Sequence, residues 1–309
     1  MVDRVRTVAV ISIGSMGAAV ARVIASGGTR VVTSVEDRSV YTRELAVAAG
    51  VERLQDLRAA VAESEALVSL VPPDGALDFA RQVAAAMRDI GTAPVFIDGN
   101  SIAPSTLEQI AAVIGSAGGR SVDLSIIGPP PTVVAPGELS RPQFYVAAPG
   151  AEVLTPYREQ GLDVRVIDGP LGSAKALKMC YAGVTKGVIA LVVEMLLAGR
   201  RMGVSAELVT QMRDTQASVF GQVSRQAEGF APKAYRWVGE MQQMELTFGP
   251  LGLPTGFFAA AAEVFARLAE TPLGHPSDIL PAEMTLDMIL DKLEQGPLGQ
   301  LSDRVPEGV

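Results

Sequence analysis

The chain has 309 residues, of which 48% are apolar and 19% charged, so it can bury a large core in one or two domains. Its net charge of −8, without a run of Lys or Arg, argues against a nucleic-acid-binding protein. One cysteine, Cys180, and one histidine, His275, exclude a disulfide framework and argue against a zinc site of Cys and His. We therefore predict no metal site and expect acid–base chemistry from carboxylates, tyrosines and lysines.

Residues 1–168 alternate short β-branched segments with longer Ala-rich segments. Short apolar segments bounded by turn residues are typical of buried strands, which we predict over 7–13, 30–35, 66–71, 95–98, 121–124, 144–147 and 164–167. Helices are predicted between them over 18–25, 41–49, 54–62, 75–87 and 104–114. This alternation predicts a Rossmann-type, doubly wound parallel sheet with helices on both faces.

From residue 169 onward the strand signals stop, and helical periodicity extends over 173–202 and then to about residue 294. We therefore predict a second, all-helical domain over 169–309 for substrate binding and dimerisation. Its most apolar stretch, 187–199, is interrupted by Glu194 and is shorter than the ~20 residues of a membrane span, so we expect a buried helix in a soluble, cytoplasmic protein. Because this helix is apolar nearly all round, we also expect at least a homodimer through it.

The first predicted strand leads directly into Ser12-Ile13-Gly14-Ser15-Met16-Gly17, with a helix after it. This is the pattern G-x-G-x-x-G with serine at the first glycine position. In such a turn the glycines let the backbone approach a pyrophosphate, and the N–H groups of the helix start face the anion. We predict that these six residues bind a dinucleotide, although small residues begin many helices without any ligand.

The second predicted strand ends close to Glu36, Arg38 and Ser39, where the adenosine ribose is read in such folds. An acidic residue there accepts hydrogen bonds from a 2′-hydroxyl and favours NAD, whereas an arginine pairs with a 2′-phosphate and favours NADP. Arg38 and Ser39 together suit a phosphate, so we favour NADP and keep NAD as the alternative. A charged loop without any cofactor role is the third interpretation.

Four stretches, in this order and spacing, resemble the β-hydroxyacid dehydrogenases: 12–17, 70–73, 98–104 and 169–178. That family contains 3-hydroxyisobutyrate and 6-phosphogluconate dehydrogenases. The chain is most similar to bacterial relatives with a helical C-terminal domain of the type DUF1932. The resemblance implies further cofactor contacts at Val71, Pro72, Pro73 and Asn100, and it implies that Lys178 is the catalytic residue.

The resemblance also implies a set of substrate-binding residues: Asn100, Ser101, Ser125, Ile127, Gly128 and Tyr181. The chain departs from the family in this set. Ile127 stands where the family has a hydroxyl side chain, although the backbone N–H groups of Ile127 and Gly128 can still donate. Tyr181 and Ala182 stand where the family has asparagines after the catalytic lysine. These departures concern the substrate more than the class of reaction.

Three of the five lysines, Lys175, Lys178 and Lys186, fall within twelve residues on one predicted helix. A partly desolvated lysine can take a hydroxyl proton as hydride leaves and can return it in the reverse reaction, and we expect Lys178 to act in this way. We expect Lys175 and Lys186 to belong to an ordinary basic helix face.

Three isolated side chains carry weaker expectations. We interpret Cys180 as a packed thiol and His275 as a structural or exposed residue in a turn. Trp237 has Arg236 and Glu240 within one helical turn, so it could close a substrate pocket. A core or subunit contact is the favoured role for Trp237.

The favoured function is an NAD(P)-dependent oxidoreductase that transfers hydride between nicotinamide and the hydroxyl or keto carbon of a small hydroxy acid or related polar alcohol. The apolar Ile126 and Ile127 favour a bulkier or less charged substrate than a sugar phosphate. The alternatives are an imine (C=N) reductase of the same architecture and a non-catalytic dinucleotide-binding protein. No nucleic-acid or membrane partner is expected.

Overall fold

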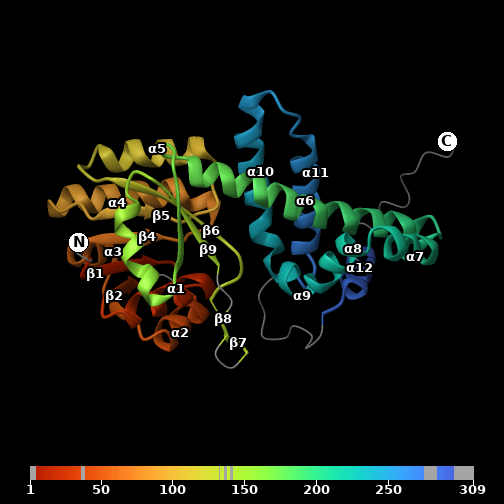
Figure 1. The fold of residues 1–309 in the computed structure, drawn as a ribbon, viewed down its shortest axis with the longest axis horizontal. Helices are drawn as coiled ribbons and strands as arrows, with labels where there is room; N and C mark the ends of the chain where they lie inside the picture. Colours follow the sequence, from red (N-terminus) through yellow and green to blue (C-terminus); the bar gives the residue numbers. More distant parts are fainter. Residues whose placement is uncertain are drawn as a thin grey trace. The chain divides into compact units, whose positions relative to one another are not determined.

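A computed structural model describes residues 5–35, 39–131, 133–135, 138–139, 142–274 and 284–295 (Figure 1). The chain divides into two compact units, Met1–Met179 and Cys180–Val309. The division falls inside the long helix α6 (Ser173–Arg201), whereas the boundary predicted from the sequence lies before this helix.

The first unit is built on an eight-stranded sheet with the order β10-β9-β6-β5-β4-β1-β2-β3. All neighbouring strands are parallel except β6 and β9, which pair antiparallel. The order β3-β2-β1-β4-β5-β6 is that of a doubly wound dinucleotide-binding sheet, so the predicted fold class is confirmed. The strands are β1 (Thr7–Ile11), β2 (Arg30–Ser34), β3 (Glu52–Leu54), β4 (Ala66–Ser69), β5 (Val95–Asp98), β6 (Ser121–Ile127), β9 (Gln143–Ala147) and β10 (Asp163–Ile167).

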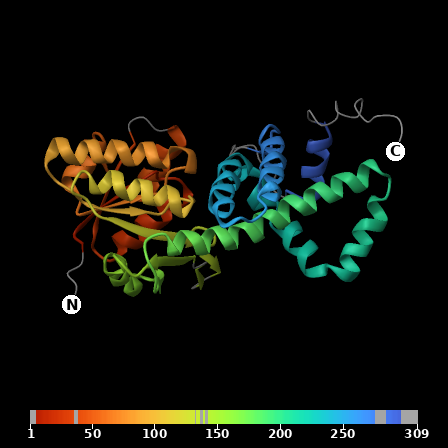
Figure 2. The same ribbon diagram turned by 90° about the horizontal axis from the view of Figure 1, so that it is seen from above.

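Helices cover the sheet on both faces, and α4 and α5 lie side by side over one of them (Figure 2). Gly91 is the C-cap residue that follows the last residue of α4, and its φ of 76° is in the left-handed region that favours glycine. Pro104 begins α5, where its missing N–H costs no hydrogen bond. The helices are α1 (Ser15–Ser26), α2 (Val40–Ala48), α3 (Leu57–Glu63), α4 (Ala76–Ile90) and α5 (Pro104–Gly115). The unit also contains a small hairpin of β7 (Val133–Ala135) and β8 (Glu138–Leu139). Its 3-10 turns are η1 (Pro73–Gly75), η2 (Ala151–Val153) and η3 (Thr155–Gln160).

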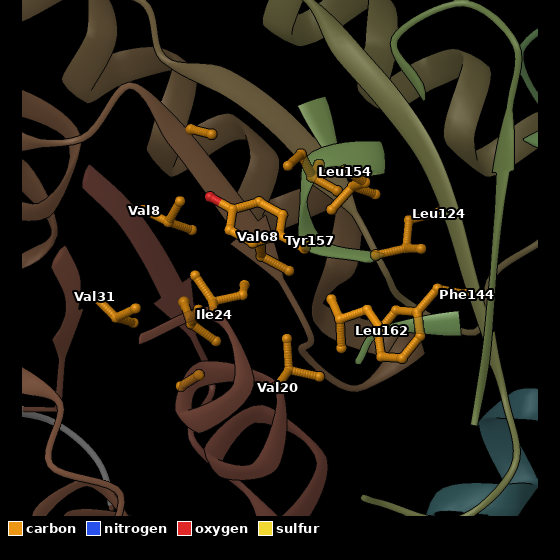
Figure 3. Packing of buried hydrophobic residues seen from close by; sticks show 14 of the residues in the cluster. Val8, Val20, Ile24, Val31, Val68, Leu124, Phe144, Leu154, Tyr157 and Leu162 are labelled. Atoms are coloured by element: carbon orange, nitrogen blue, oxygen red, sulfur yellow. The ribbon is translucent and has the colours of Figure 1, made fainter. Parts of the chain in front are cut away.

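The alternation of side chains along the strands gives the sheet two apolar cores. Val8 and Val10 of β1 pack with α1 on one face, where Tyr157 of η3 is also buried (Figure 3). Ala9 and Ile11 of the same strand face α3, α4 and α5. Since residues i and i+2 of a strand share a face, one strand supplies both cores. This double burial explains why the strands are apolar without interruption.

Two predicted boundaries in the first unit are wrong. Residue 54 ends the edge strand β3 and does not begin a helix. The helix α3 starts after Asp56, whose side chain accepts a hydrogen bond from the Ala59 N–H (2.8 Å) and caps the first turn. The strand β6 continues three residues beyond the predicted end, because Leu124–Ile127 pair with β9.

The described residues of the second unit form helices and contain no strand. Trp237 of α10 stacks on Phe230 at 6.1 Å and meets Phe265 edge-on at 5.1 Å, so it belongs to an aromatic cluster inside this unit. His275 and the tail after residue 295 lie outside the described residues. The elements are the remainder of α6, α7 (Ser205–Thr215), α8 (Ala217–Arg225), α9 (Ala227–Phe230), η4 (Ala231–Lys233), α10 (Ala234–Phe248), η5 (Gly249–Leu251), α11 (Gly256–Ala269) and α12 (Leu286–Gln295).

Among the residues that the structure describes, α6 is the helix whose length and composition would allow it to cross a membrane. Its most apolar 18-residue window has a mean hydropathy of 1.7, and 44% of that window is buried. The core helix of a soluble protein can have the same length and mean hydropathy. The prediction of a buried helix over 187–199 is correct for one face of the helix, which carries the buried Ile189, Val193 and Leu196. On the other face Leu191 and Met195 are exposed.

Candidate active site at the carboxyl edge of the sheet

The turns that follow β1, β4 and β5 meet at the carboxyl edge of the sheet, because these three strands are parallel neighbours. The order of the sheet reverses direction between β1 and β4, and ligands of doubly wound sheets bind in the crevice at that point. Three of the sequence-predicted stretches lie there: 12–17, 70–73 and 98–104.

The turn after β1 is closed by a contact that requires glycine at position 17. A Cβ on Gly17 would lie 2.3 Å from the carbonyl oxygen of Ser12, which is far inside van der Waals contact. Ser12 itself has a φ of 73°, in the left-handed region that costs a residue with a Cβ about 1–2 kcal/mol. The serine therefore takes the conformation for which glycine is favoured at this position.

The start of α1 is arranged to receive an anion. Gly14 is the N-cap residue and offers no side chain to the first-turn N–H groups, and no acidic residue lies in that turn. A Cβ added to Gly14 would meet no atom within 4 Å, so the approach to the helix start is open. Backbone N–H groups and the helix dipole both favour a phosphate at such a place. The residues present fit a dinucleotide pyrophosphate.

The ribose end of the predicted cofactor site is described in part. Glu36 and Arg38 lie outside the described residues. Ser39 is the N-cap of α2, and its hydroxyl accepts a hydrogen bond from the Thr42 N–H (3.2 Å). The observed role of Ser39 is therefore to start α2, and its contact with a 2′-phosphate stays a prediction.

The loop after β4 leads through Val71 and Pro72 into the 3-10 turn η1 at Pro73. Pro72 is exposed, Val71 is half-buried and Pro73 is buried. Pro72 thus presents an apolar ring next to the crevice, as a contact under a nicotinamide ribose would require.

Asn100 is held in a polar network at the end of β5. Its Nδ2 donates to Asp98 Oδ2 (2.8 Å) and to Ser69 Oγ (3.1 Å), and its backbone N–H donates to Asp98 Oδ1 (3.0 Å). The side chain is 1% exposed. Asp98 therefore fixes the orientation of Asn100, and the predicted contact of Asn100 with a ligand is not tested by this arrangement. Ser101, next in the chain, is half-buried.

Lys175 lies in the interior of the first unit, fully buried. Its Nζ contacts Asp98 Oδ1 (2.9 Å) and lies 4.0 Å from Asp123 Oδ1. It also donates to the backbone oxygens of Asp98 (2.8 Å) and Leu124 (2.6 Å). The expectation that Lys175 belongs to an exposed basic face is wrong, because four oxygen atoms from β5 and β6 surround its ammonium group. Lys175 thus ties the first turn of α6 to the carboxyl ends of two strands.

Asp123 caps the same helix from the side of the sheet. Its Oδ2 accepts hydrogen bonds from the backbone N–H groups of Gly172 (2.9 Å) and Ala174 (2.8 Å) at the start of α6. Its Oδ1 has no hydrogen-bond partner among the described residues. Burial raises the pKa of Asp123 above its usual value, although Lys175 and the helix N–H groups act in the opposite direction.

Lys178 follows Lys175 by one helical turn and is partly exposed, in contrast to its fully buried neighbour. Residues three apart lie on nearly the same side of a helix, so the contacts of Lys175 also fix the backbone position of Lys178. Tyr181, a further turn along, is 53% exposed. Lys178 is therefore a partly exposed lysine on the end of α6 that Lys175 fixes to the sheet edge.

Two family models match the chain. The NAD binding domain of 6-phosphogluconate dehydrogenase matches residues 7–139, and the domain of unknown function DUF1932 matches residues 200–268. A conserved protein of unknown function, described as structurally similar to 3-hydroxyacid dehydrogenases, is 25% identical, with a TM-score of 0.61 over 85% of this chain and 97% of that one. The chain belongs to the β-hydroxyacid dehydrogenase-like proteins with a DUF1932 domain. The predicted family is thereby confirmed.

Two further solved structures share the β-hydroxyacid dehydrogenase-like fold. The 3-hydroxyisobutyrate dehydrogenase of Mycobacterium tuberculosis is 18% identical, with a TM-score of 0.64 over 93% of this chain and 99% of that one. An imine reductase variant from Myxococcus stipitatus is 16% identical, with a TM-score of 0.52 over 93% of this chain and 99% of that one. The same fold thus serves enzymes that are named for C–O and for C=N substrates.

The substrate residues implied by the resemblance to β-hydroxyacid dehydrogenases are not equally accessible. Ser125 is fully buried in β6, and its hydroxyl has no hydrogen-bond partner within the described ranges. Ile127 is half-buried and Gly128 is exposed, with a φ of 120° that glycine adopts readily. Ile127 is still paired with Gln143 of β9, so among these three residues Gly128, just beyond the strand, is the one that is exposed.

Two other sequence predictions in this β-hydroxyacid dehydrogenase-like chain are wrong. Lys186 is not on a solvated basic face: its Nζ forms a short ion pair with Glu240 and lies 5.2 Å from the centre of the Trp237 ring. Cys180 is exposed and does not pack as a buried thiol.

Sequence reasoning missed the buried cluster of Asp98, Asp123 and Lys175. A signal was present, since Asp98 ends an apolar strand and Asp123 lies inside another, positions where a carboxylate needs a partner. A lysine at the start of a helix that follows such strands is a candidate for that partner.

Proposed function

We propose that this chain is an NAD(P)-dependent oxidoreductase that transfers hydride between nicotinamide and the hydroxyl or keto carbon of a small hydroxy acid or related polar alcohol. The observation that carries the proposal is the position of Lys178, partly exposed and one turn from Lys175, which is tied to β5 and β6 at the cofactor edge of the sheet. A group at such a place can exchange protons with a bound substrate while its backbone stays fixed.

When bound, the nicotinamide ring supplies the hydride acceptor or donor. The N–H groups at the start of α1 would hold its pyrophosphate, and Pro72 would contact its nicotinamide ribose. Neutral Lys178 takes the hydroxyl proton of the alcohol at its Nζ during oxidation. In the reverse direction its ammonium group donates that proton to the developing alkoxide.

The substrate preference follows from the loop after β6. Ile127 replaces a hydroxyl side chain, so a substrate carboxylate would be bound by backbone N–H groups and without side-chain help. Ile126 is buried in the core of the sheet, whereas Ile127 on the other face of the strand is half-buried and places an apolar side chain next to this loop. This supports a substrate that is bulkier or less charged than a sugar phosphate.

We propose NADP as the cofactor because Arg38 and Ser39 suit a 2′-phosphate, with NAD as the alternative. Calorimetric titration of both dinucleotides tests this. Arg38→Ala should weaken NADP binding at least about ten-fold and leave NAD binding nearly unchanged, since a charge-assisted pair is lost with one cofactor and not with the other. Equal weakening of both would contradict the assignment. The cytoplasmic location stays a prediction.

The test of the catalytic role is Lys178→Ala, assayed on a panel of hydroxy acids and polar alcohols. Loss of a general acid–base group should lower kcat by about 10²–10⁴-fold while the Kd of the dinucleotide stays the same. The matched control is Lys292→Ala, which removes an exposed lysine of α12 that contacts Gln295. Failure of the wild-type protein to bind either dinucleotide would overturn the proposal.

Two outcomes separate the alternatives. If Lys178→Ala still reduces a cyclic imine and neither protein oxidises an alcohol, the chain is an imine reductase. If the dinucleotide binds but no substrate of either class turns over, the chain is a non-catalytic dinucleotide-binding protein.

A further inference from the structure

Basic side chains lie beside a largely buried ion pair at the start of α10. Lys233 is the N-cap residue of α10, and three residues follow it on nearly the same side of the helix, after three, four and seven positions: Arg236, Trp237 and Glu240. Lys186 of α6 faces them, because its Nζ pairs with Glu240 and lies 5.2 Å from the centre of the Trp237 ring. The ion pair therefore fixes this side of α10 within the second unit.

The charges on this side of α10 do not balance. Lys186 and Glu240, 12% and 6% exposed, neutralise each other. Lys233 and Arg236 are exposed, and neither forms an ion pair with a carboxylate among the described side chains. Three positive groups and one negative group leave two positive charges, in a chain whose net charge is −8. A local excess of positive charge attracts an anion.

The ammonium group of Lys233 lies close to the protein, although the residue as a whole is exposed. A Cβ on Gly229 of α9 would lie 3.9 Å from its Nζ, so the glycine leaves the ammonium group accessible. Desolvation lowers the pKa of Lys233, and the positive charges of Arg236 and Lys186 lower it further, whereas Glu240 acts in the opposite direction. An anion bound here would relieve the repulsion between these like charges.

The chemistry of Lys233 and Arg236 indicates the class of ligand. Ammonium and guanidinium groups donate hydrogen bonds and accept none, so they suit the oxygens of an oxyanion. The planar guanidinium can donate two parallel hydrogen bonds to a carboxylate or a phosphate. Two uncompensated positive charges match a dianion. A polyanion such as a nucleic acid is disfavoured, because the acidic chain around the pair would repel it.

We propose that Lys233 and Arg236 bind the doubly charged oxyanion of a small molecule, a phosphate monoester or a dicarboxylate. Both side chains donate to the oxygens of the ligand. The Lys186–Glu240 pair, neutral as a whole, holds the side of α10 that carries them. All of these residues belong to the second unit, and the proposal does not depend on the proposed function.

The first test uses the fluorescence of Trp237, the one tryptophan of the chain, which lies one helical turn from Lys233 and next to Lys186. Inorganic phosphate, succinate, acetate and chloride are titrated at constant ionic strength. At least one of the two dianions should change the emission saturably, and acetate and chloride should not. The tighter of phosphate and succinate identifies the source of the charge. No saturable change with either dianion, or an equal change with acetate or chloride, would overturn the proposal.

The second test removes the two cations one at a time. Lys233→Ala and Arg236→Ala should each weaken binding of the dianion at least about ten-fold, because each change removes a charge-assisted hydrogen bond. The matched controls, Lys292→Ala on α12 and Arg225→Ala on α8, remove exposed cations of the same unit and should leave the Kd unchanged. Both pairs of variants change exposed residues, so the circular dichroism spectrum should stay that of the wild type. Equal weakening by the controls would mean that net charge alone is responsible and would overturn the assignment.

Discussion

The parts of α6 before and after the division at Met179 differ in what they bury. In the part up to Met179 a lysine is fully buried, and in the part from Cys180 onward Leu191 and Val184 are among the most exposed apolar side chains of the described residues. Lys175 can be buried because Asp98, Asp123 and two carbonyl groups satisfy it. Leu191 is exposed because none of the described side chains of its own unit covers that face. Whether a side chain of this helix is buried therefore depends more on the groups that surround it than on whether the residue is polar or apolar.

The largest effect on stability is expected for Lys175→Met. This change leaves two buried carboxylates without their cation, and removal of one partner of a buried ion pair costs about 3–5 kcal/mol. The free energy of unfolding in urea measures the loss. Lys178→Met, one turn away and partly exposed, is the matched control and should cost less than about 1 kcal/mol. Similar losses for the two variants would mean that the buried cluster contributes nothing specific.

A smaller loss is expected for Lys186→Met, in the part of α6 that belongs to the second unit. Its side chain is 12% exposed and its partner Glu240 is 6% exposed, so solvent still reaches the pair. Loss of a hydrogen bond to a charged group costs about 1–3 kcal/mol. The double variant Lys186→Met and Glu240→Met should recover part of that loss in urea unfolding, because the buried carboxylate is removed together with the ammonium group that faces it. A double variant less stable than the single one would contradict this explanation.

Asp123→Asn should change how stability depends on pH. The pKa of Asp123 is raised in the folded chain, so the folded state holds this proton more tightly than the unfolded state. The wild type therefore loses stability from this group as the pH rises through the raised pKa, and the variant does not. The stability of the variant relative to the wild type should therefore increase in urea titrations as the pH rises above the ordinary Asp pKa of about 4. Parallel pH profiles would show that burial does not perturb this carboxyl group.

The smallest effect is expected for Leu191→Ala on the exposed face of α6. The free energy of unfolding should change by less than about 0.5 kcal/mol, because the side chain is already exposed. Leu196→Ala on the buried face of the same helix should cost about 2–5 kcal/mol. Equal costs for the two variants would show that Leu191 is covered by other side chains.

The parts of the fold that follow from local patterns were predictable from the sequence. The turn 12–17 and the helix over 173–202 were found because their signals lie within a few neighbouring residues. The edge strand β3 was missed because Glu52-Arg53-Leu54 has no apolar pattern and is a strand through its pairing with β2. Lys175 was misplaced because its ion-pair partner Asp98 is 77 residues away in the chain. Local sequence patterns do not show which strand ends, far apart in the chain, lie next to each other in the fold.

The division of the chain inside α6 has a consequence for how far each half can stand alone. Asp98 and Asp123 belong to the sheet, but the cation that neutralises them arrives with the first turn of α6. A fragment that ends at residue 168 would retain two buried acids without Lys175, whereas a fragment that ends at residue 179 would keep the cluster whole. The dinucleotide-binding module is thus completed by a piece of the helix that leads out of it. Exchange of the helical half between relatives would have to preserve that first turn.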